Sequence, residues 1–408
     1  MRILFAVHGY KPAYRIGGPI ISVSALAEEL VRRGHRVTVV TSNGNLDEKL
    51  DVPTNRPVEV DGVEVWYFAR EMPLHRLAPL IPYLGRSIGF LYSRAMRPML
   101  DRVVPSVDLV HTQMPFVYPT LAAAKAASRH GKPLFYHQRG VFDPTSLRFR
   151  SVKKRLYIAA VERRLLRGAT TLFALTEAER HSYAELGVQT PVRIIPNGVH
   201  ADRYRTNPAA SADIMLSCAR DATVVLFMGR IHPTKGADKL LDAFVRVAAR
   251  HPRAVLVMAG PDEWKLQLGF ARAVGEAGLT DRVRFPGMVT GNEKLDLLAR
   301  ADLFCLPSDA EGFSIAVLEA MASGTAVLLS PGCHFAAAEA GGAGRIVPAT
   351  VDALSAALDQ LLGDPAALRA MGARGRQLVL ERYTWERVTE ETVDAYEEGM
   401  RRHAALRR

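Results

Sequence analysis

The sequence predicts an α/β protein built from two doubly wound parallel sheets, and three observations lead to this prediction. The chain has 408 residues, and single hydrophobic cores stop growing at roughly 250–300 residues, so two domains are expected. Short apolar runs alternate with longer helical patterns, which is typical of a parallel sheet covered by helices on both faces. The alternation starts again after Pro196-Asn197-Gly198, a turn signature, so each half should form one sheet.

The first half contains seven short apolar runs that we expect to be strands. They are residues 3–7, 37–41, 63–68, 109–111, 134–137, 170–174 and 192–195. Helical patterns lie between them, for example at residues 20–33, 117–129 and 152–167.

The second half repeats this arrangement with shorter and more apolar strands. The expected strands are residues 223–229, 254–260, 282–285, 303–306 and 326–330, and a charged helix follows at about 385–402. We therefore expect domains at 1–198 and 199–384 and a C-terminal helix within 385–408. Ligands of open α/β sheets bind beyond the carboxyl ends of the strands, so the chemistry is expected in a cleft between the two domains.

Composition excludes several classes of protein. A hydrophobic content of 48% and a charged content of 23% exclude a disordered or fibrous chain. The three cysteines (Cys218, Cys305 and Cys333) are too few for a disulfide framework and lack the spacing of a metal site, which favours a reducing, cytoplasmic location. We expect neither a secretory signal nor a membrane span, because no uncharged apolar window approaches ~18 residues.

The excess of positive over negative charge comes from one part of the chain. The net charge is +11, and residues 71–167 alone carry 17 basic and five acidic residues. A basic face attracts phosphate-bearing partners such as nucleic acid, anionic lipid or a diphosphate-linked substrate. A solvated face that only aids solubility is the alternative.

Adjacent glycines precede the first long helix. Gly17 and Gly18 follow the first strand after a loop, where backbone N–H groups and the helix dipole can approach an anion. The spacing differs from the G-x-G-x-x-G dinucleotide fingerprint, so a nicotinamide oxidoreductase is disfavoured. A tight helix entry is the structural alternative.

Two cations follow the first strand of the second half. Arg230 comes directly after the strand 223–229, and Lys235 follows five residues later. A guanidinium fork and a mobile ammonium group can converge on one diphosphate. An ordinary helix entry at Lys235-Gly236 is the alternative.

The most specific motif is a pair of glutamates separated by seven residues. Glu311 follows a buried strand and the turn Pro307-Ser308-Asp309, and Glu319 lies in the apolar helical run 316–322. Carboxylates placed at two depths suit a polyhydroxylated ligand, because each can accept two hydroxyl hydrogen bonds. Gly312 opens this helix, which leaves the N–H groups of Phe313, Ser314 and Ile315 available to hydroxyls or phosphate oxygens.

Together these motifs resemble the family 4 retaining glycosyltransferases. The Glu-x7-Glu pair, Gly229-Arg230, Lys235-Gly236 and the turn before Val199 carry the resemblance, which extends over nearly the whole chain. It implies the GT-B fold, two facing Rossmann-like domains with a C-terminal helix that crosses back to the first domain. His200 departs from the aspartate that relatives usually carry after this turn.

The resemblance also implies a role for each motif. Glu319 would bind the ribose of a nucleotide-sugar donor, and Glu311 would contact the donor sugar. Arg230 and Lys235 would hold the diphosphate, which Gly17 and Gly18 would approach from the other domain. The base would lie near Gly260-Pro261 and the strand 283–285. The remaining donor-binding positions are Gly312, Phe313, Ser314 and Ile315.

The end of the strand 134–137 offers two further candidates. In relatives a histidine here often touches the donor sugar, and the best register places Arg139 at that position with His137 two residues earlier. Either side chain is a candidate for this contact. No Asp-x-Asp sequence occurs, so the metal-dependent alternative glycosyltransferase fold has no support, and we expect no metal and no cofactor.

The basic region of the first domain suggests the acceptor. Residues 148–157 with Arg86, Arg94, Arg97 and Arg102 suit a lipid-linked glycan acceptor or an anionic membrane surface. Apolar residues that could dock at such a surface are Leu77, Leu80, Ile81, Leu84, Ile88 and Leu91, although packing on the sheet explains them equally well.

We therefore predict a retaining hexosyltransferase that uses a UDP- or GDP-sugar to build a lipid-linked surface polysaccharide precursor. The expected location is the cytoplasm or the inner face of the cytoplasmic membrane. One alternative is a nucleotide-sugar epimerase of the same architecture, which would need no acceptor site. The other is a non-catalytic module for nucleic acid or acidic polymers, which would leave Arg230, Lys235, Glu311 and Glu319 unexplained.

Overall fold

The computed structural model describes residues 1–46, 48–71, 91–143, 151–204, 206, 212 and 218–407, without the side chains of residues 151 and 153. These residues form two compact units. Unit 1 comprises Met1–Pro196 and Val388–Arg408, and unit 2 comprises Asn197–Arg387. The boundaries expected from the sequence, after residues 198 and 384, lie within a few residues of these divisions.

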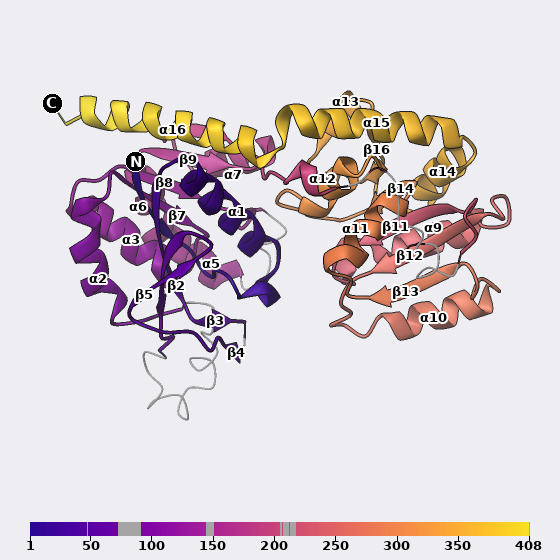
Figure 1. Ribbon diagram of the computed structural model, residues 1–408, viewed down its shortest axis with the longest axis horizontal. Coiled ribbons are helices and arrows are strands. Elements are labelled where there is room, and N and C mark those ends of the chain that lie inside the picture. The colour runs from indigo at the N-terminus through magenta and orange to yellow at the C-terminus, as the bar shows by residue number, and fades with distance from the viewer. Residues whose placement is uncertain are drawn as a thin grey trace. The chain divides into compact units, whose positions relative to one another are not determined.

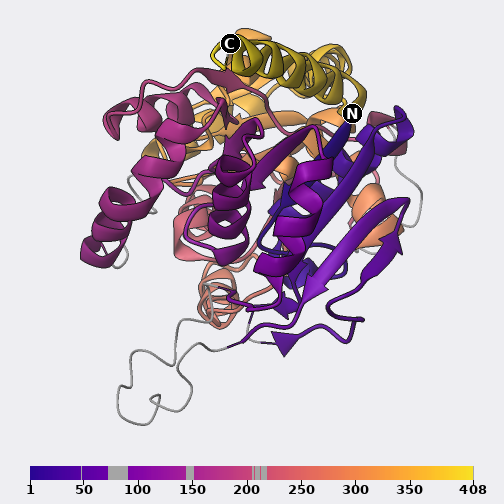
Figure 2. The same cartoon turned by 90° about the vertical axis from the view of Figure 1, so that its left-hand side faces the viewer.

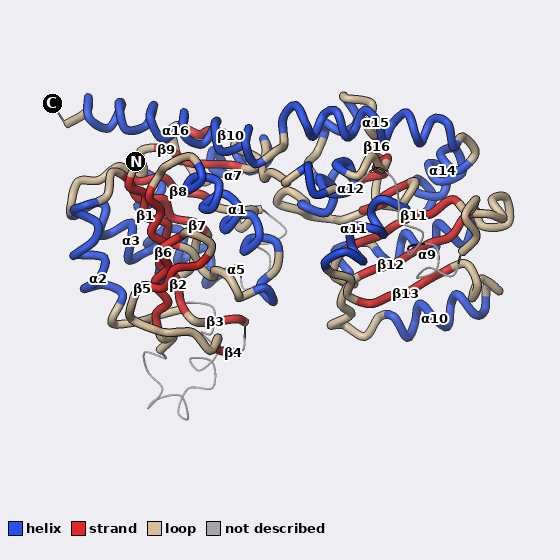
Figure 3. Tube along the Cα trace, viewed as in Figure 1, coloured by secondary structure: helices blue, strands red, loops and turns tan. Residues whose placement is uncertain are grey.

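Unit 1 is built on an eight-stranded sheet of order β10-β9-β8-β7-β1-β2-β6-β5, drawn as red segments in Figure 3. All neighbouring strands are parallel except β5 and β6. The strands are β1 Arg2–Ala6, β2 Arg36–Ser42, β5 Pro57–Val60, β6 Val63–Phe68, β7 Leu109–Gln113, β8 Leu134–His137, β9 Thr171–Ala174 and β10 Val192–Ile194. A separate two-residue pair is formed by β3 Gly44–Asn45 and β4 Glu48–Lys49.

The antiparallel edge strand β5 was not expected from the sequence. It joins β6 through Asp61 and Gly62, whose φ angles are 50° and 78°. Two consecutive residues with positive φ form the tight turn that a two-residue hairpin requires, and Asp-Gly is a preferred pair for it. The expectation of a purely parallel sheet is therefore wrong at this edge.

Helices cover both faces of the unit 1 sheet, and Figure 2 shows several of them in front of the strands. A cluster of buried side chains joins α2 and α3 to the sheet. The helices of this unit are α1 Gly18–Arg32, α2 Met96–Val103, α3 Tyr118–Arg129, α5 Ser151–Tyr157, α6 Arg163–Gly168, α7 Glu177–Glu185 and α16 Trp385–Ala405, with 3₁₀ turns at Tyr14–Ile16 and Val104–Ser106.

The helix expected at residues 152–167 contains a π-helical turn. α5 and α6 are joined by the π segment Ile158–Glu162. The Glu162 side chain is buried, and it accepts hydrogen bonds from the Phe116 N–H at 2.8 Å and the Tyr136 hydroxyl at 2.7 Å. The wider turn thus coincides with an inward-pointing glutamate that is tied to two neighbouring segments.

Unit 2 is built on a parallel six-stranded sheet of order β13-β12-β11-β14-β15-β16. The strands are β11 Thr223–Met228, β12 Ala254–Ala259, β13 Val283–Gly287, β14 Leu303–Leu306, β15 Ala326–Leu329 and β16 Gly344–Ile346. The first five match the sequence-based prediction closely, whereas the short strand β16 was not expected.

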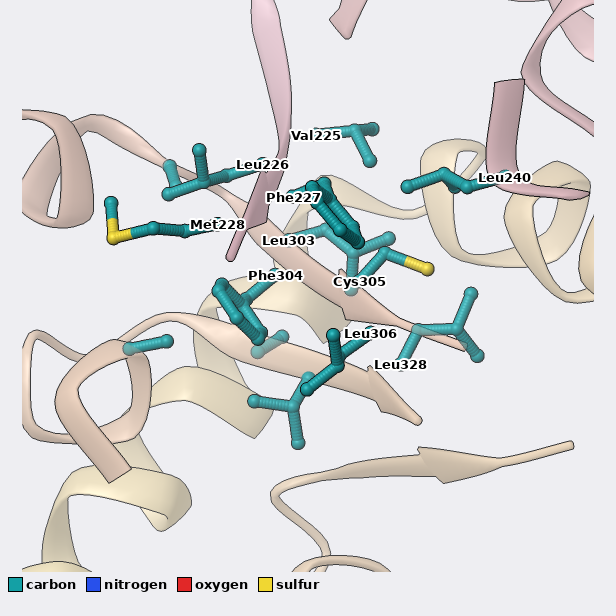
Figure 4. Close-up of a cluster of buried hydrophobic side chains, with 14 of the residues drawn as sticks. Val225, Leu226, Phe227, Met228, Leu240, Leu303, Phe304, Cys305, Leu306 and Leu328 are labelled. Carbon is teal, nitrogen blue, oxygen red and sulfur yellow. The ribbon is translucent and has the colours of Figure 1, made fainter. Parts of the chain in front are cut away.

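The core of unit 2 is formed by buried side chains of the strands and of the helices on both faces of the sheet. Figure 4 shows side chains of β11, β14 and β15 packed together, among them Phe227, Phe304 and Leu328, which are fully buried. The helices are α9 Ala237–Val247, α10 Gln267–Glu276, α11 Gly291–Arg300, α12 Ile315–Ala322, α13 Ala336–Ala340, α14 Val351–Leu362 and α15 Pro365–Arg382, with 3₁₀ turns at Ala201–Arg203, Pro233–Lys235 and Pro331–Cys333.

The last helix, α16, leaves unit 2 and packs on unit 1, as the resemblance implied (Figure 1). The hydroxyl of Tyr396 lies 2.6 Å from Nδ1 of His111 on β7, and both side chains are buried. Arg402 donates to the Thr170 carbonyl at 2.6 Å, next to β9. These contacts attach the C-terminal helix to β7 and to the start of β9.

Candidate functional site

In unit 2 the chain reverses its direction of winding next to β11. The chain passes from β11 to β12 and β13 on one side, and then returns to place β14 on the other side of β11. Ligands of open α/β sheets bind at the carboxyl ends of the strands at such a reversal. The loop after β11 contains Arg230 and Lys235, and the loop after β14 contains Glu311, so the sequence motifs lie at this reversal.

The two loops are joined by hydrogen bonds and by a close backbone approach. The Asp309 N–H donates to the Thr234 carbonyl at 2.8 Å, and the Ser308 hydroxyl donates to the same oxygen at 3.0 Å. Gly236 has a φ of 66°, and a Cβ there would lie 2.3 Å from the carbonyl oxygen of Pro307. Only glycine permits this approach, which brings the start of α9 to the loop that follows β14.

Lys235 and Glu311 form a largely buried ion pair across these loops. Lys235 Nζ lies 2.5 Å from Glu311 Oε1, and the two side chains are 19% and 10% exposed. An ammonium group has three N–H donors, so Lys235 can donate to further oxygens beside this carboxylate. Arg230 is exposed, and no ion pair or hydrogen bond of its side chain is found among the described residues.

Backbone donors follow Glu311 directly. Glu311 donates its own N–H to the Gly332 carbonyl, and α12 then begins at Ile315 with Ser314 as its N-cap. Within the described parts of the chain, the N–H groups of Gly312, Phe313, Ser314 and Ile315 have no hydrogen-bond acceptor. A run of unpaired N–H groups at a helix N-terminus favours an anion or hydroxyl oxygens.

Glu319 lies within α12 itself and is held by two donors. Its side chain is buried, and its Oε1 accepts from the Tyr204 hydroxyl at 2.8 Å and from Lys294 Nζ at 2.6 Å. Both bonds reach the same oxygen, so Oε2 retains its capacity to accept. Burial, followed by the charge and the hydrogen bond of Glu319, raises the pKa of Tyr204, so its hydroxyl stays protonated and donates.

Sequence reasoning missed both partners of Glu319. Tyr204 is 115 residues and Lys294 is 25 residues away in the sequence, and neither belongs to a local motif. Lys294 lies on α11 directly after the Gly287–Gly291 loop, which is a position where a strand-to-helix connection meets the ligand edge of the sheet. The sequence signal for Lys294 was this position at the start of the helix after a strand.

The loop after β12 reaches the same edge of the sheet. Gly260 has a φ of 144°, and a Cβ there would lie 1.8 Å from the carbonyl oxygen of Gly229. The Asp262 carboxylate accepts from the N–H groups of Leu266 and Gln267, which fixes the following turn. Trp264, 58% exposed, packs edge-on against His232 with ring centroids 4.8 Å apart. This aromatic pair was not predicted from the sequence.

In unit 1 the corresponding reversal lies between β1 and β7. Gly17 is the N-cap of α1 and Gly18 is its first residue. The buried His8 follows β1, and neither of its ring nitrogens has a hydrogen-bond partner among the residues that the structure describes. Burial, and then the Arg139 charge, lowers the pKa of His8 to about 4, so this ring is neutral at physiological pH.

Arg139 joins the ends of β7 and β8 to the first turns of α1. Its guanidinium donates to Gln113 Oε1 at 2.9 Å and 2.6 Å and to the Ser22 hydroxyl at 3.2 Å. Burial lowers the pKa of Arg139 to about 10, which still leaves the group charged at neutral pH. Arg139 therefore lies at the same edge of the sheet as His8 and the start of α1.

His137 lies elsewhere, on the face of the sheet that packs against α16. Its ring stacks with that of His111 at 6.1 Å and meets Phe173 edge-on at 6.1 Å. Burial, followed by the charges of Arg139 and His111, lowers the pKa of His137 well below its ordinary value. Of the two sequence-based candidates in this segment, Arg139 lies at the ligand edge and His137 lies in the core.

The described residues also bear on the expectations about metal ligands, membrane spans and the apolar docking residues. In the described part of the chain, no three His, Cys, Asp or Glu side chains group as metal ligands, and no helix has the length and apolar content needed to cross a bilayer. Of the apolar docking residues, Leu77, Leu80, Ile81, Leu84 and Ile88 lie outside the described residues, as do Arg86 and residues 148–150.

Comparison with known proteins agrees with this geometry. Residues 17–198 match the family model described as a glycosyl transferase 4-like domain, and residues 218–378 match the model described as glycosyl transferases group 1. The chain is 29% identical to a D-inositol 3-phosphate glycosyltransferase of Kineococcus radiotolerans, with 96% of this chain and 92% of the relative covered. It is 27% identical to a GDP-mannose:cellobiosyl-diphosphopolyprenol alpha-mannosyltransferase of Xanthomonas oryzae, with 77% and 81% covered.

Solved structures share the fold. A glycosyltransferase from Rickettsia africae superposes with a TM-score of 0.74 at 16% identity, with 98% of both chains covered. Anabaena HepE in complex with UDP and glucose superposes with a TM-score of 0.72 at 18% identity, with 97% of this chain and 99% of that chain covered.

The two Rossmann-like units and the returning helix, with an ion pair and free N–H groups at a strand reversal, define a GT-B glycosyltransferase. The chain belongs to the glycosyltransferase family whose 4-like and group 1 domains together match most of its length. This membership favours a transferase over the epimerase and over the non-catalytic binding module.

Proposed function

We propose that this glycosyltransferase moves a hexosyl group from a UDP- or GDP-sugar to a hydroxyl of a glycan acceptor, with retention of anomeric configuration. The observation that carries the proposal is the Lys235–Glu311 ion pair, which lies directly before the free N–H groups of Gly312 to Ile315. Cations and backbone donors suit a diphosphate, whereas a carboxylate suits sugar hydroxyls. The site combines both kinds of group.

The chemistry of donor cleavage explains this combination. When the bond between the anomeric carbon and the diphosphate breaks, negative charge develops on the departing phosphate. Fixed positive groups and oriented N–H dipoles stabilise such charge without reorganisation. We assign this role to Arg230, Lys235 and the N–H groups at the start of α12, and we assign the hydroxyls of the donor sugar to Glu311. The family resemblance further assigns Gly17 and Gly18 to the diphosphate.

Glu319 is assigned to the ribose of the donor. Its Oε1 is held by Tyr204 and Lys294, which fixes the carboxylate and leaves Oε2 to accept from a hydroxyl. A carboxylate fixed by packing, by a hydroxyl donor and by an ammonium donor loses little entropy on binding. The nucleobase is assigned to the neighbouring loops after β12 and β13, where Gly260 lies.

Retention is proposed from the family resemblance, with front-face displacement and the leaving phosphate as the acceptor of the proton. The test is proton NMR of the product formed from UDP-glucose or GDP-mannose during the first turnovers. An α-linked product from these α-linked donors is the expected result. A β-linked product would overturn the retaining mechanism and leave the transferase assignment intact.

The acceptor is proposed to be a lipid-linked glycan at an anionic membrane. The excess of cations in residues 71–167 supports this assignment, as does the lipid-diphosphate acceptor in the name of the Xanthomonas relative. Sedimentation with vesicles containing phosphatidylglycerol should carry the protein down at low salt and release it at 0.5 M salt, because screening shortens the reach of these charges. Absence of binding at low salt would contradict membrane association.

A further inference from the structure

Two cavities lie side by side along the exposed ridge of α3 in unit 1. The first, of about 610 Å³, lies between α2 and α3, and its polar lining includes Tyr92, Arg94, Arg97, Tyr118, Lys125 and Arg129. The second, of about 510 Å³, lies between α3 and the segment from the π turn to α6. Leu121, Lys125 and Arg129 line both cavities, so the two adjoin along this helix.

Cations outnumber carboxylates around this pair of cavities. Arg94 pairs with Glu71 at 3.0 Å, whereas Arg97 and Arg129 share Asp101. Lys125 and Arg164 are exposed, and neither has a carboxylate partner among the described residues. The lining therefore has an excess of positive charge that is centred on Lys125.

The first cavity also has an aromatic wall. Tyr92 and Tyr118 pack edge-on with ring centroids 4.8 Å apart. Burial raises the pKa of Tyr118, so its hydroxyl stays protonated at neutral pH and can donate a hydrogen bond. Guanidinium, ammonium and phenol donors around one cavity match the acceptor oxygens of a phosphate group.

The second cavity has an apolar floor. Ala124 and Leu134 are buried beneath it, and Ala160, Val161 and Leu165 form its far side. The bonds from Phe116 and Tyr136 to Glu162 hold the π turn that supplies Ala160 and Val161. A groove with this lining suits a hydrocarbon chain, because the chain would cover apolar surface without burying a polar group.

We propose that the two cavities form one binding site for a phosphate-headed amphiphile. The phosphate lies in the first cavity against Lys125 and the two tyrosines, and the hydrocarbon chain lies in the second. A site for a simple anion would need only the first, polar cavity, so the adjoining apolar groove favours a ligand that has a hydrocarbon chain as well as a phosphate. The site lies wholly within unit 1 and rests on the proposed lipid-linked acceptor, because its cations belong to the basic region 71–167; none of its residues belongs to the donor site.

The test is calorimetric titration of the full chain with three probes at 0.15 M salt. The probes are octyl phosphate below its micelle concentration, inorganic phosphate and octyl glucoside. Octyl phosphate should bind at least tenfold more tightly than either of the others, because only it fills both cavities. The double variant Lys125→Glu with Arg164→Glu should weaken octyl phosphate binding at least tenfold. The double variant Arg56→Glu with Arg382→Glu, which changes the net charge equally at exposed positions elsewhere, should change it less than twofold.

A third variant separates the two cavities. Ala160→Trp places a large ring at the exposed side of the apolar groove, so it should weaken octyl phosphate and leave inorganic phosphate unchanged. Equal affinity for octyl phosphate and inorganic phosphate, an equal loss in the control pair, or binding to anionic vesicles without binding to octyl phosphate would each overturn the proposal. Thermal stabilisation by nucleotides, measured in the same variants, reports on the donor site separately.

Discussion

At the scale of single residues, Lys235 is the central cation of the proposed donor site. We expect Lys235→Met to weaken binding of the matching nucleoside diphosphate at least tenfold, about 1.4 kcal/mol, because the diphosphate loses its ammonium partner. The same change leaves the Glu311 carboxylate with little exposure and without its cation, which destabilises unit 2. Calorimetric titration and thermal unfolding measure the two effects.

Glu311→Gln is the matched control for this variant. It also removes the ion pair, but it leaves Lys235 able to bind the diphosphate, so nucleotide affinity should stay within about threefold of wild type while transfer activity falls. Equal loss of nucleotide affinity in both variants would show that the ion pair is only structural.

Glu179 gives the protein a pH-dependent stability. Burial is the main cause that raises the pKa of Glu179 from 4.5 to about 7. The unfolded chain releases this proton near pH 4.5, whereas the folded chain holds it until about pH 7, so stability falls as pH rises between these values and is level above them. Glu179→Gln removes this fall, and its stability relative to wild type should therefore increase from pH 5 to pH 7.

Thermal unfolding of both proteins between pH 5 and pH 8 measures this difference. Gln can still accept the hydrogen bond that Glu179 accepts from the Leu175 N–H at 2.8 Å, so the comparison isolates the charge. A gap between the two proteins that does not change with pH would contradict the assignment.

The sequence identifies residues that belong to a local motif and misses their distant partners. Glu311, Glu319 and Lys235 were singled out as candidates from their local motifs and from the family resemblance. Tyr204, the partner of Glu319, and Gln113, the partner of Arg139, were not predicted, because each meets its partner only through the packing of separate elements. His137 illustrates the converse case: a strand end suggests a ligand edge, but the alternation of side chains along β8 places this ring on the face that packs against α16.

At the scale of elements, the close approach of two strand ends supports the donor site. A Cβ on Gly260 would collide with the Gly229 carbonyl, and the φ of 144° is also strained for any other residue. Gly260→Ala should destabilise unit 2 by about 2 kcal/mol or more. Gly229→Ala is the control, because a Cβ there meets no atom within 4 Å, and it should cost less than half as much. Equal effects in thermal unfolding would contradict this explanation.

The strands of both units were predictable because buried parallel strands form short, continuous apolar runs between helical patterns. β5 and β16 were missed for different reasons. β5 alternates between exposed and half-buried positions, and its Asp61-Gly62 turn was the available signal. β16 is only three residues long, Gly344–Ile346, and has no apolar run of its own. The π turn has no sequence signal beyond the inward-pointing Glu162.

At the scale of the whole molecule, two units of the same construction have different surfaces. Residues 71–167 of unit 1 hold the excess of basic residues and the two cavities along α3. Unit 2 holds the Glu-x7-Glu motif with its cations and backbone donors. The sequence predicted this division from charge and motifs, but it could not predict the cavities, because they depend on how α2, α3 and α6 pack.

The central claim is that unit 2 binds a nucleoside diphosphate with Glu319 on the ribose. The most direct measurement is thermal unfolding of wild type, Glu319→Ala and Glu319→Gln with UDP, GDP, ADP and dTDP, each near 1 mM. A ligand at about 100 times its Kd adds roughly 2.7 kcal/mol to the free energy of unfolding, which raises the Tm measurably. We predict stabilisation of wild type by UDP or GDP and a loss of that stabilisation in both variants. No response to any of the four nucleotides would contradict the account.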